Sequence, residues 1–350
     1  MKFNSVPDDK EIRSAAALLR SGGTVAFPTE TVYGLGADAS NPFAVQKIFA
    51  IKGRPSFHPL IVHVAAGSEL TRWAKNIPDA AWQLAKTFWP GPLTLILERS
   101  ALVPDAVTGG QNTVGLRAPD HPVAAALLHE FGGGIAAPSA NRFGQVSPTT
   151  AQHVHEKLGG QVGMILDGGA CRIGVESTIV SFVQETPTLL RPGGLAVEAI
   201  EEVLGQKILL VQSGAQKVRA SGMLDSHYAP GIPFEVCSGN ELIHRARQLA
   251  SMGYRVAVLN MGNEDAENLG MDGITCFCMP DSSAEYARKL YATLHGLDCG
   301  IFNWILAEAP PATQEWNAIN DRMRRASCRT VAHSSESLIE MCSSGETLSR

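Results

Sequence analysis

Short apolar segments rich in leucine and β-branched residues recur through the first 205 residues, and they constrain the fold more than any other feature of the sequence. Each has the length of a buried strand, and helical stretches at 78–88, 122–131 and 149–158 separate several of them. Strands and helices that intermingle in this way predict an α/β domain. The predicted strands are LIVHV (60–64), LTLIL (93–97), TVGLRA (113–118), GIAAP (134–138), MILD (164–167), STIVSF (177–182) and TLLR (188–191).

The N-terminal stretch predicts two helices with a strand and a loop between them. Residues 8–20 carry acids in the first turn, apolar residues at helical spacing and a Gly-Gly stop. A predicted strand at 24–27 follows. The next segment, 29–40, is rich in glycine and hydroxyl side chains, so we interpret it as a functional loop. A second helix is predicted over 42–52, opened by Asn-Pro.

A change in pattern near residue 205 predicts a domain boundary. The last helix of the interleaved region is predicted at 197–205, so we expect a first domain over 1–205. Residues 206–231 lose periodicity and collect Ser, Gly, Lys and Arg, with three cations against one acid, which is typical of a linker. Strands and helices alternate again over 232–340, which predicts a smaller open α/β domain. Residues 341–350 are expected to form a loose tail.

Charge and composition exclude several classes of protein. The net charge of −5 argues against a protein that coats nucleic acid, which usually has a basic face. No apolar run reaches the roughly 18 residues of a membrane helix, and the start lacks the apolar stretch of a signal peptide. We therefore expect a cytoplasmic protein with no membrane association.

The seven cysteines include no Cys-x-x-Cys pair, so they indicate structural thiols and no protein-bound metal. Cys276 and Cys278 lie in the segment ITCFCMP, which we interpret as a buried strand.

A first candidate anion site lies at the end of the predicted helix over 42–52. Lys52 and Arg54 flank Gly53, and Pro55 follows, so the two cations are held in one turn. A fixed pair of cations suits an anionic ligand. The alternative is that they only complement the helix dipole.

A second candidate is the predicted strand over 113–118. Alternation places Thr113, Gly115 and Arg117 on one face, which leaves room beside the arginine for a carboxylate or phosphate. The alternative for Arg117 is a surface salt bridge.

A third candidate starts where the predicted strand over 134–138 ends. Ser139 and Asn141 follow the strand, and Ser147-Pro148-Thr149 precede a helix, an arrangement that presents donors to phosphates. A capped turn explains the second of these groups equally well. Glycine and hydroxyl residues recur in GVEST (174–178), and Arg191 is held in a turn by Pro-Gly-Gly.

Several common catalytic patterns do not occur in this sequence. There is no GxxxxGK[ST] loop, no third glycine to complete a dinucleotide fingerprint, no GxSxG elbow and no HExxH motif. Glu30 and Glu176 are single acids among hydroxyls, and neither forms an obvious carboxylate pair. Without a nucleophile or base, we expect chemistry that depends on positioning substrates.

Taken together, these segments resemble the YrdC/Sua5 family of threonylcarbamoyl-AMP synthases. The similarity spans nearly all of residues 10–205, and the longer, two-domain members also share HYAPG (227–231) and AINDRMRRAS (318–327). Two positions differ from residues common in the family, namely His58 and Ser226. The other motifs are PTETVYGLG (28–36), Lys52 with Arg54, PLIVH (59–63), WPGPLT (89–94), TVGLRAPDHP (113–122), Ser139 with Asn141, GVESTI (174–179) and LLRPGG (189–194).

The resemblance implies an open, twisted, mixed α/β sheet with a basic cavity on its concave face, and a Rossmann-like C-terminal domain. It implies a nucleotidyltransferase that converts L-threonine, bicarbonate and ATP to threonylcarbamoyl-AMP and pyrophosphate, with Mg²⁺ accompanying ATP. The product would pass to a threonylcarbamoyl transferase that modifies adenosine 37 of tRNA, so any contact of this chain with tRNA would be indirect.

The resemblance also assigns residue roles. Lys52 and Arg54 are the implied catalytic cations, and the linker would cover the cavity mouth with His227 and Tyr228 as lid residues. The implied L-threonine site is Thr29, His63, Arg117, Ala137 and Ser177. The implied ATP site is Lys52, Arg54, His58, Thr113, Ser139, Asn141, Ser147 and Arg191.

Two other functions are compatible with parts of this pattern. A concave basic surface would suit an RNA-binding module, although the net charge and the scarcity of aromatics near the basic segments disfavour it. Carbamoyl-handling enzymes of the hydrogenase-maturation kind share the first domain. They also carry an acylphosphatase-like region and zinc-finger cysteine pairs, which this sequence lacks.

Overall fold

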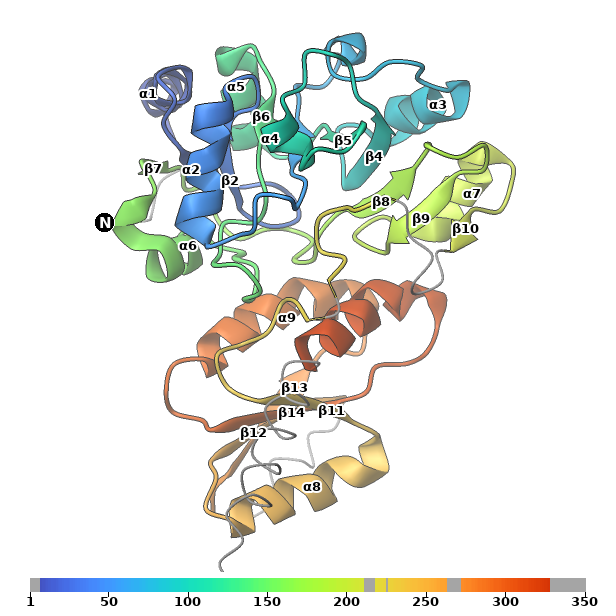
Figure 1. Cartoon of the computed structure of the whole chain (residues 1–350). Coiled ribbons are helices and arrows are strands. Elements are labelled where there is room, and N and C mark those ends of the chain that lie inside the picture. The colour runs from blue at the N-terminus through green and yellow to red at the C-terminus, as the bar shows by residue number, and fades with distance from the viewer. Residues whose placement is uncertain (1–6, 211–217, 225, 263–271, 328–350) are drawn as a thin grey trace, which may run out of the picture.

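Two sheets organise the molecule, a large one in the N-terminal part and a small one in the C-terminal part (Figure 1). The structure is a computed structural model that describes residues 7–210, 218–224, 226–262 and 272–327. The predicted tail at 341–350, residues 328–340 of the second domain, and residues 211–217 and 225 of the linker lie outside these ranges. No helix within the described ranges is both long enough and apolar enough to cross a membrane.

The large sheet of the described residues has ten strands in the order β10-β9-β8-β4-β5-β3-β6-β2-β1-β7, with parallel and antiparallel neighbours, so the predicted mixed sheet is confirmed. Its strands are β1 (Val25–Phe27), β2 (Gly34–Asp38), β3 (Ile61–His63), β4 (Leu93–Glu98), β5 (Thr113–Arg117), β6 (Ile135–Ala136), β7 (Met164–Ile165), β8 (Thr178–Ser181), β9 (Thr188–Arg191) and β10 (Leu209–Leu210). The accompanying helices are α1 (Asp9–Arg20), α2 (Pro42–Lys52), α3 (Asp79–Phe88), α4 (Asp105–Thr108), α5 (Pro122–Phe131), α6 (Ala151–Leu158) and α7 (Val197–Leu204).

Local sequence signals set the ends of the first two helices. The Asp8 side chain accepts from the Glu11 backbone N–H and the Glu11 side chain accepts from the Asp8 backbone N–H, which is a capping box at the start of α1. The Asn41 side chain caps α2, and α2 ends at Gly53, whose φ of 63° is the left-handed conformation that glycine adopts at low cost. Both predicted helices are therefore confirmed, and Gly53 sets the direction in which Arg54 leaves the helix.

The segment predicted as a functional loop, 29–40, contains strand β2 instead, in the interior of the sheet. A Cβ atom at Gly36 would lie 2.6 Å from Ile135 Cγ2 and 2.8 Å from the Phe27 ring. That glycine is required because neighbouring side chains pack over the strand, not because a ligand approaches it. Only residues 29–33 remain as a loop beside the cavity described below.

The small sheet in the described residues has four parallel strands, in the order β11-β14-β12-β13. Alternate residues of β12 face opposite sides, so Val256 and Val258 pack against α8 while Ala257 and Leu259 pack against α9. Its elements are β11 (Phe234–Cys237), α8 (Gly239–Ser251), β12 (Val256–Met261), β13 (Ile274–Met279), α9 (Ser283–Leu297), β14 (Trp304–Glu308) and a helical segment at 317–327.

Strand β13 corrects the prediction of a buried ITCFC strand. It lies at the edge of the small sheet, so Cys276 is only partly buried and Cys278 is exposed. Both are free thiols in the structure.

The two parts share an apolar core. Val32, Val146 and Val175 of the N-terminal part pack in one cluster with α9 and the helical segment 317–327, both on the side of the small sheet turned toward the N-terminal part (Figure 1). The loops of the N-terminal part that carry these three valines are therefore packed against the second domain.

Candidate active site

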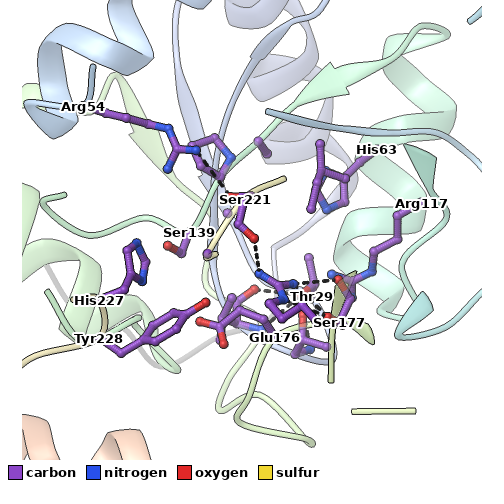
Figure 2. Close-up of a pocket in the computed structure, with 18 residues that line it drawn as sticks. Thr29, Arg54, His63, Arg117, Ser139, Glu176, Ser177, Ser221, His227 and Tyr228 are labelled. Atoms are coloured by element: carbon purple, nitrogen blue, oxygen red, sulfur yellow. Dashed lines mark hydrogen bonds between the residues drawn. The ribbon is translucent and has the colours of Figure 1, made fainter. Parts of the chain in front are cut away.

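A small cavity of about 40 Å³ lies where several strands of the large sheet end, and the linker (residues 206–231) contributes to its wall (Figure 2). The lining residues are Thr29, Thr31, Val32, Gly34, Arg54, Ile61, His63, Arg117, Ala137, Pro138, Ser139, Glu176, Ser177, Arg191, Ser221, Gly222, His227 and Tyr228.

All five residues of the predicted threonine site line this cavity. The topology explains the convergence, because β3 and β5 are parallel neighbours and their last residues, His63 and Arg117, lie opposite each other. Thr29 follows β1, Ala137 follows β6 and Ser177 precedes β8. Residues far apart in sequence thus meet because their strands end at one place.

Arg117 is buried and forms a buried ion pair with Glu30, with 2.7 Å between Arg117 Nη2 and Glu30 Oε2. The predicted alternative of a surface salt bridge is therefore wrong, since both side chains are inside. Arg117 Nε also donates to the Gly91 carbonyl at 3.3 Å. Burial, together with the charge of Arg117, lowers the pKa of His63 to about 3, so this imidazole is neutral at pH 7.

Two further arginines face the cavity without a carboxylate partner among the described residues. Arg54 Nη2 donates to the Pro59 carbonyl at 3.0 Å, and Arg191 donates twice to the Ser177 carbonyl through Nε (3.2 Å) and Nη2 (2.8 Å). Burial lowers the pKa of Arg54 to about 10, so it stays charged at pH 7. Backbone carbonyls hold these guanidinium groups in place and leave their charge available to an anion.

The linker touches both arginines. The Ser221 carbonyl accepts from Arg191 Nη1 at 2.9 Å, and the Ser221 hydroxyl lies 3.5 Å from Arg54 Nη2 (Figure 2). His227 and Tyr228, the predicted lid residues, are buried and line the cavity.

Several buried polar atoms around the cavity have no aligned hydrogen-bond partner within the described ranges. Buried polar atoms are nearly always paired in folded proteins, and an unpaired one costs about 1–3 kcal/mol. Their concentration here indicates a cavity that receives a polar ligand. The atoms are Arg54 Nε, His63 Nδ1, His227 Nδ1 and Tyr228 Oη.

The predicted ATP site divides into two groups. Arg54, Ser139 and Arg191 line the cavity, whereas Lys52, His58, Thr113, Asn141 and Ser147 do not. The Lys52 ammonium is buried and donates to the carbonyls of Ser139 and Asn141, the latter at 2.6 Å. Burial and the nearby charge of Arg54 lower the pKa of Lys52.

The remaining residues of this second group do not line the cavity, and Thr113 is the first residue of β5, at the end of the strand opposite Arg117. Asn141 Nδ2 donates to the carbonyls of Arg142 and Gln145, and Ser147 Oγ donates to Glu176 Oε1 at 2.6 Å. The His58 ring stacks at an angle on Phe57 and Phe143.

Comparison with known proteins places the chain in a family. The family model described as telomere recombination, Sua5/YciO/YrdC, matches residues 17–193. The chain belongs to the Sua5/YciO/YrdC family. A second model, described as the threonylcarbamoyl-AMP synthase C-terminal domain, matches residues 195–328.

Long members of the family are similar over almost the whole chain. The threonylcarbamoyl-AMP synthases of Pyrococcus abyssi and Bacillus subtilis are 42% and 44% identical, covering 91% of this chain and 95% and 93% of theirs. The crystal structure of P. abyssi Sua5 complexed with L-threonine has a TM-score of 0.86 and 40% identity, covering 93% of this chain and 96% of that one.

Eight cavity-lining residues were not among the predicted site residues of this Sua5/YciO/YrdC chain, namely Thr31, Val32, Gly34, Ile61, Pro138, Glu176, Ser221 and Gly222. Glu176 lies inside the GVEST motif, which pointed to the region but not to the carboxylate. Ser221 and Gly222 lie in the linker, where no periodicity or motif marks them. Gly222 has a φ of 77°, and a Cβ there would lie 2.2 Å from Tyr228 Oη, so the backbone approaches the site closely.

Proposed function

We propose that this chain is an adenylate-forming synthase that makes threonylcarbamoyl-AMP and pyrophosphate from L-threonine, bicarbonate and ATP. The observation that carries the proposal is the cavity, in which all five predicted threonine positions meet beside two arginines that have no carboxylate partner in the part of the chain that the structure describes. The relatives named threonylcarbamoyl-AMP synthase cover most of this chain at 42–44% identity.

The threonine end of the cavity suits an amino acid. A second carboxylate can reach Arg117, because a guanidinium has five donors and the ion pair with Glu30 engages only one terminal nitrogen. The Thr29, His63 and Ser177 side chains supply polar groups for the amine and hydroxyl. Because His63 is neutral, it does not repel the positively charged amino group of threonine as the substrate binds.

The reaction needs no covalent intermediate on the protein. The deprotonated threonine amine condenses with bicarbonate and loses water, or adds to CO₂ and loses a proton, to give N-carboxythreonine. The new carboxylate then attacks the α-phosphorus of ATP as pyrophosphate leaves. Both reactants are anions, so Arg54 and Arg191 lower the barrier by offsetting charge at the phosphorus, a contribution of about 10²–10³ in rate for one donor. Lys52 holds the loop at 139–141 through its ammonium group and contributes positive potential to the phosphates without contacting them.

Magnesium enters this proposal with the nucleotide. Among the described residues there is no group of three or more His, Cys, Asp or Glu side chains arranged to hold a metal ion. Mg²⁺ commonly takes substrate phosphates and water as ligands, so the ATP complex is the substrate and Mg²⁺ offsets phosphate charge within it. The linker, which lies beside both arginines, shields the labile acyl-adenylate from water.

The product then goes to a threonylcarbamoyl transferase acting on adenosine 37 of tRNA, and the reaction belongs in the cytoplasm because ATP and tRNA are both present there. An RNA-binding module is disfavoured, because the site is a buried pocket rather than an open basic surface with stacking aromatics.

Mass spectrometry of a reaction with ATP, ¹³C-bicarbonate, L-threonine and Mg²⁺ tests the proposal, with each substrate omitted in turn. We expect an adenylate that carries ¹³C and requires both threonine and bicarbonate. A folded protein that binds threonine but releases no pyrophosphate would refute the synthase assignment. Binding of RNA with a steep salt dependence would then favour the alternative.

A further inference from the structure

The carboxylate of Glu176 reaches the cavity wall but is held by the second domain. It accepts from Arg322 Nε at 2.6 Å and from Tyr291 Oη at 3.1 Å, both of which belong to the C-terminal part. From its own domain it accepts from Ser147 Oγ at 2.6 Å. The side chain of Arg322 is completely buried, so this is a salt bridge formed inside the interface.

Arg322 makes a second contact with the first domain. Its Nη2 donates to the Pro192 carbonyl at 3.0 Å, and its guanidinium lies 5.1 Å from the ring centroid of Tyr228. Glu176 precedes Ser177 in the chain and Pro192 follows Arg191. Arg322 therefore contacts Glu176 and Pro192, which are the chain neighbours of the cavity residues Ser177 and Arg191. It also packs against the ring of Tyr228 in the linker.

A carboxylate on the wall of a nucleotide cavity is unfavourable unless its charge is compensated, because ATP is a polyanion. Burial alone raises the pKa of Glu176, but Arg322, Arg191 and the Ser147 hydrogen bond together lower it, so Glu176 is ionised at pH 7. Arg191 is one of the two cations that face the cavity. An uncompensated negative charge on Glu176 would reduce the positive electrostatic potential that Arg191 offers to ATP. Arg322 can compensate Glu176 without facing the cavity. Arg322 Nη1 also pairs with Asp321 Oδ2 at 2.7 Å, but Arg325 Nε lies 2.9 Å from Asp321 Oδ1 and compensates that carboxylate in turn.

We propose that Arg322 is a positioning residue of the active site. From the C-terminal domain it fixes the Glu176 side chain and compensates its negative charge, so that the positive potential of Arg191 acts on the nucleotide. The inference rests on the proposed function only in naming ATP as the anion. It assigns to the second domain a share in nucleotide binding, exerted through a residue that does not touch the nucleotide.

Charge variants of the full-length protein test this inference, with ATP affinity measured by calorimetric titration and KM for ATP and threonine measured separately. Arg322→Met removes the cation and keeps an unbranched side chain of similar length. We expect it to weaken ATP binding by about 10- to 100-fold, the effect of one uncompensated charge some 6–10 Å away at an effective dielectric constant near 20. The KM for threonine should change much less.

The decisive comparison is with Glu176→Gln and with the double variant. Glu176→Gln removes the negative charge, so ATP binding should be unchanged or tighter, and Arg322→Met/Glu176→Gln should recover most of the affinity lost in Arg322→Met. A purely structural role would make the double variant at least as poor as the single one. The matched control is Arg324→Met, since Arg324 is on the same helical segment but is largely exposed and bonds only Asp321.

The outcomes separate this inference from the proposed function. Unchanged ATP affinity in folded Arg322→Met, or weaker binding in all three variants alike, would overturn the inference. If Arg322→Met does not fold, Glu176→Gln and the double variant remain decisive, because a large loss of ATP affinity in Glu176→Gln would also overturn it. Absence of threonylcarbamoyl-AMP from the wild-type protein would refute the proposed function, while ATP titration would still test the inference.

Discussion

Replacing Arg117 with methionine should damage both stability and threonine binding, and the two losses can be separated. The ion pair with Glu30 spans 2.7 Å, and the two side chains are only 5% and 1% exposed. Removing one partner of such a pair leaves a buried charge and costs about 3–5 kcal/mol in the free energy of unfolding. If Arg117 meets the threonine carboxylate as proposed, losing this cation costs at least about 2 kcal/mol, or roughly 30-fold in Kd.

The second substitution, Glu30→Gln, distinguishes the two effects. In Arg117→Met/Glu30→Gln no charge remains buried, so urea unfolding should recover most of the lost stability, whereas threonine binding by calorimetry should stay weak. Arg172→Met is the control, because its ion pair with Asp120 is exposed and should contribute less than about 1 kcal/mol. Wild-type threonine affinity in folded Arg117→Met would refute the assignment. Recovered affinity in the double variant would show that Arg117 acts only by compensating Glu30.

Two further predictions concern buried cations and histidines. Lys52→Met should lower the free energy of unfolding by about 2–4 kcal/mol, because two carbonyls lose a buried charged donor. Lys47→Met, on the same helix, removes a single, part-buried hydrogen bond to the Gly22 carbonyl and should cost less than about 1.5 kcal/mol. Equal losses in urea unfolding would contradict this. Burial, and to a smaller extent the adjacent His153, lower the pKa of His295 to about 3. As pH falls from about 6.5 toward 3, this histidine therefore becomes protonated in the unfolded chain but stays neutral in the folded one. Stability should fall there by up to about 1.4 kcal/mol per pH unit for this one group, and His295→Gln should show a slope smaller by about one proton; parallel slopes would contradict the assignment.

That the candidate threonine-site residues stand at strand ends could be predicted because the information is local. Thr29, His63, Arg117 and Ser177 each stand at or beside a strand end, and strands whose ends meet at one edge bring such residues together. The resemblance to a family then gave each of them a role. The helix ends at Asp8 and Gly53 were predictable for the same reason, since caps depend on neighbouring residues.

Contacts between distant segments could not be predicted. The sequence shows Glu30 and Arg117 as separate charges, and only the tertiary arrangement brings them into one buried pair. Lys52 was predicted to face phosphates, but the loop carbonyls that hold it come from residues 139–141. Arg322 lies in a recognisable motif, yet nothing near it in the sequence indicates that its partner is 146 residues away.

The position of Ser221 has a consequence for measured affinities. Its carbonyl and hydroxyl contact the two arginines that a polyphosphate needs, and the cavity they leave is about 40 Å³, against roughly 300–1,000 Å³ for typical ligand pockets. If ATP binds at these two arginines as proposed, it binds only to molecules in which this segment has moved aside. The observed dissociation constant is the intrinsic one divided by the fraction of such molecules, so a fraction of about 1% weakens binding about 100-fold. Evolution can thus tune nucleotide affinity through linker residues that never contact the nucleotide.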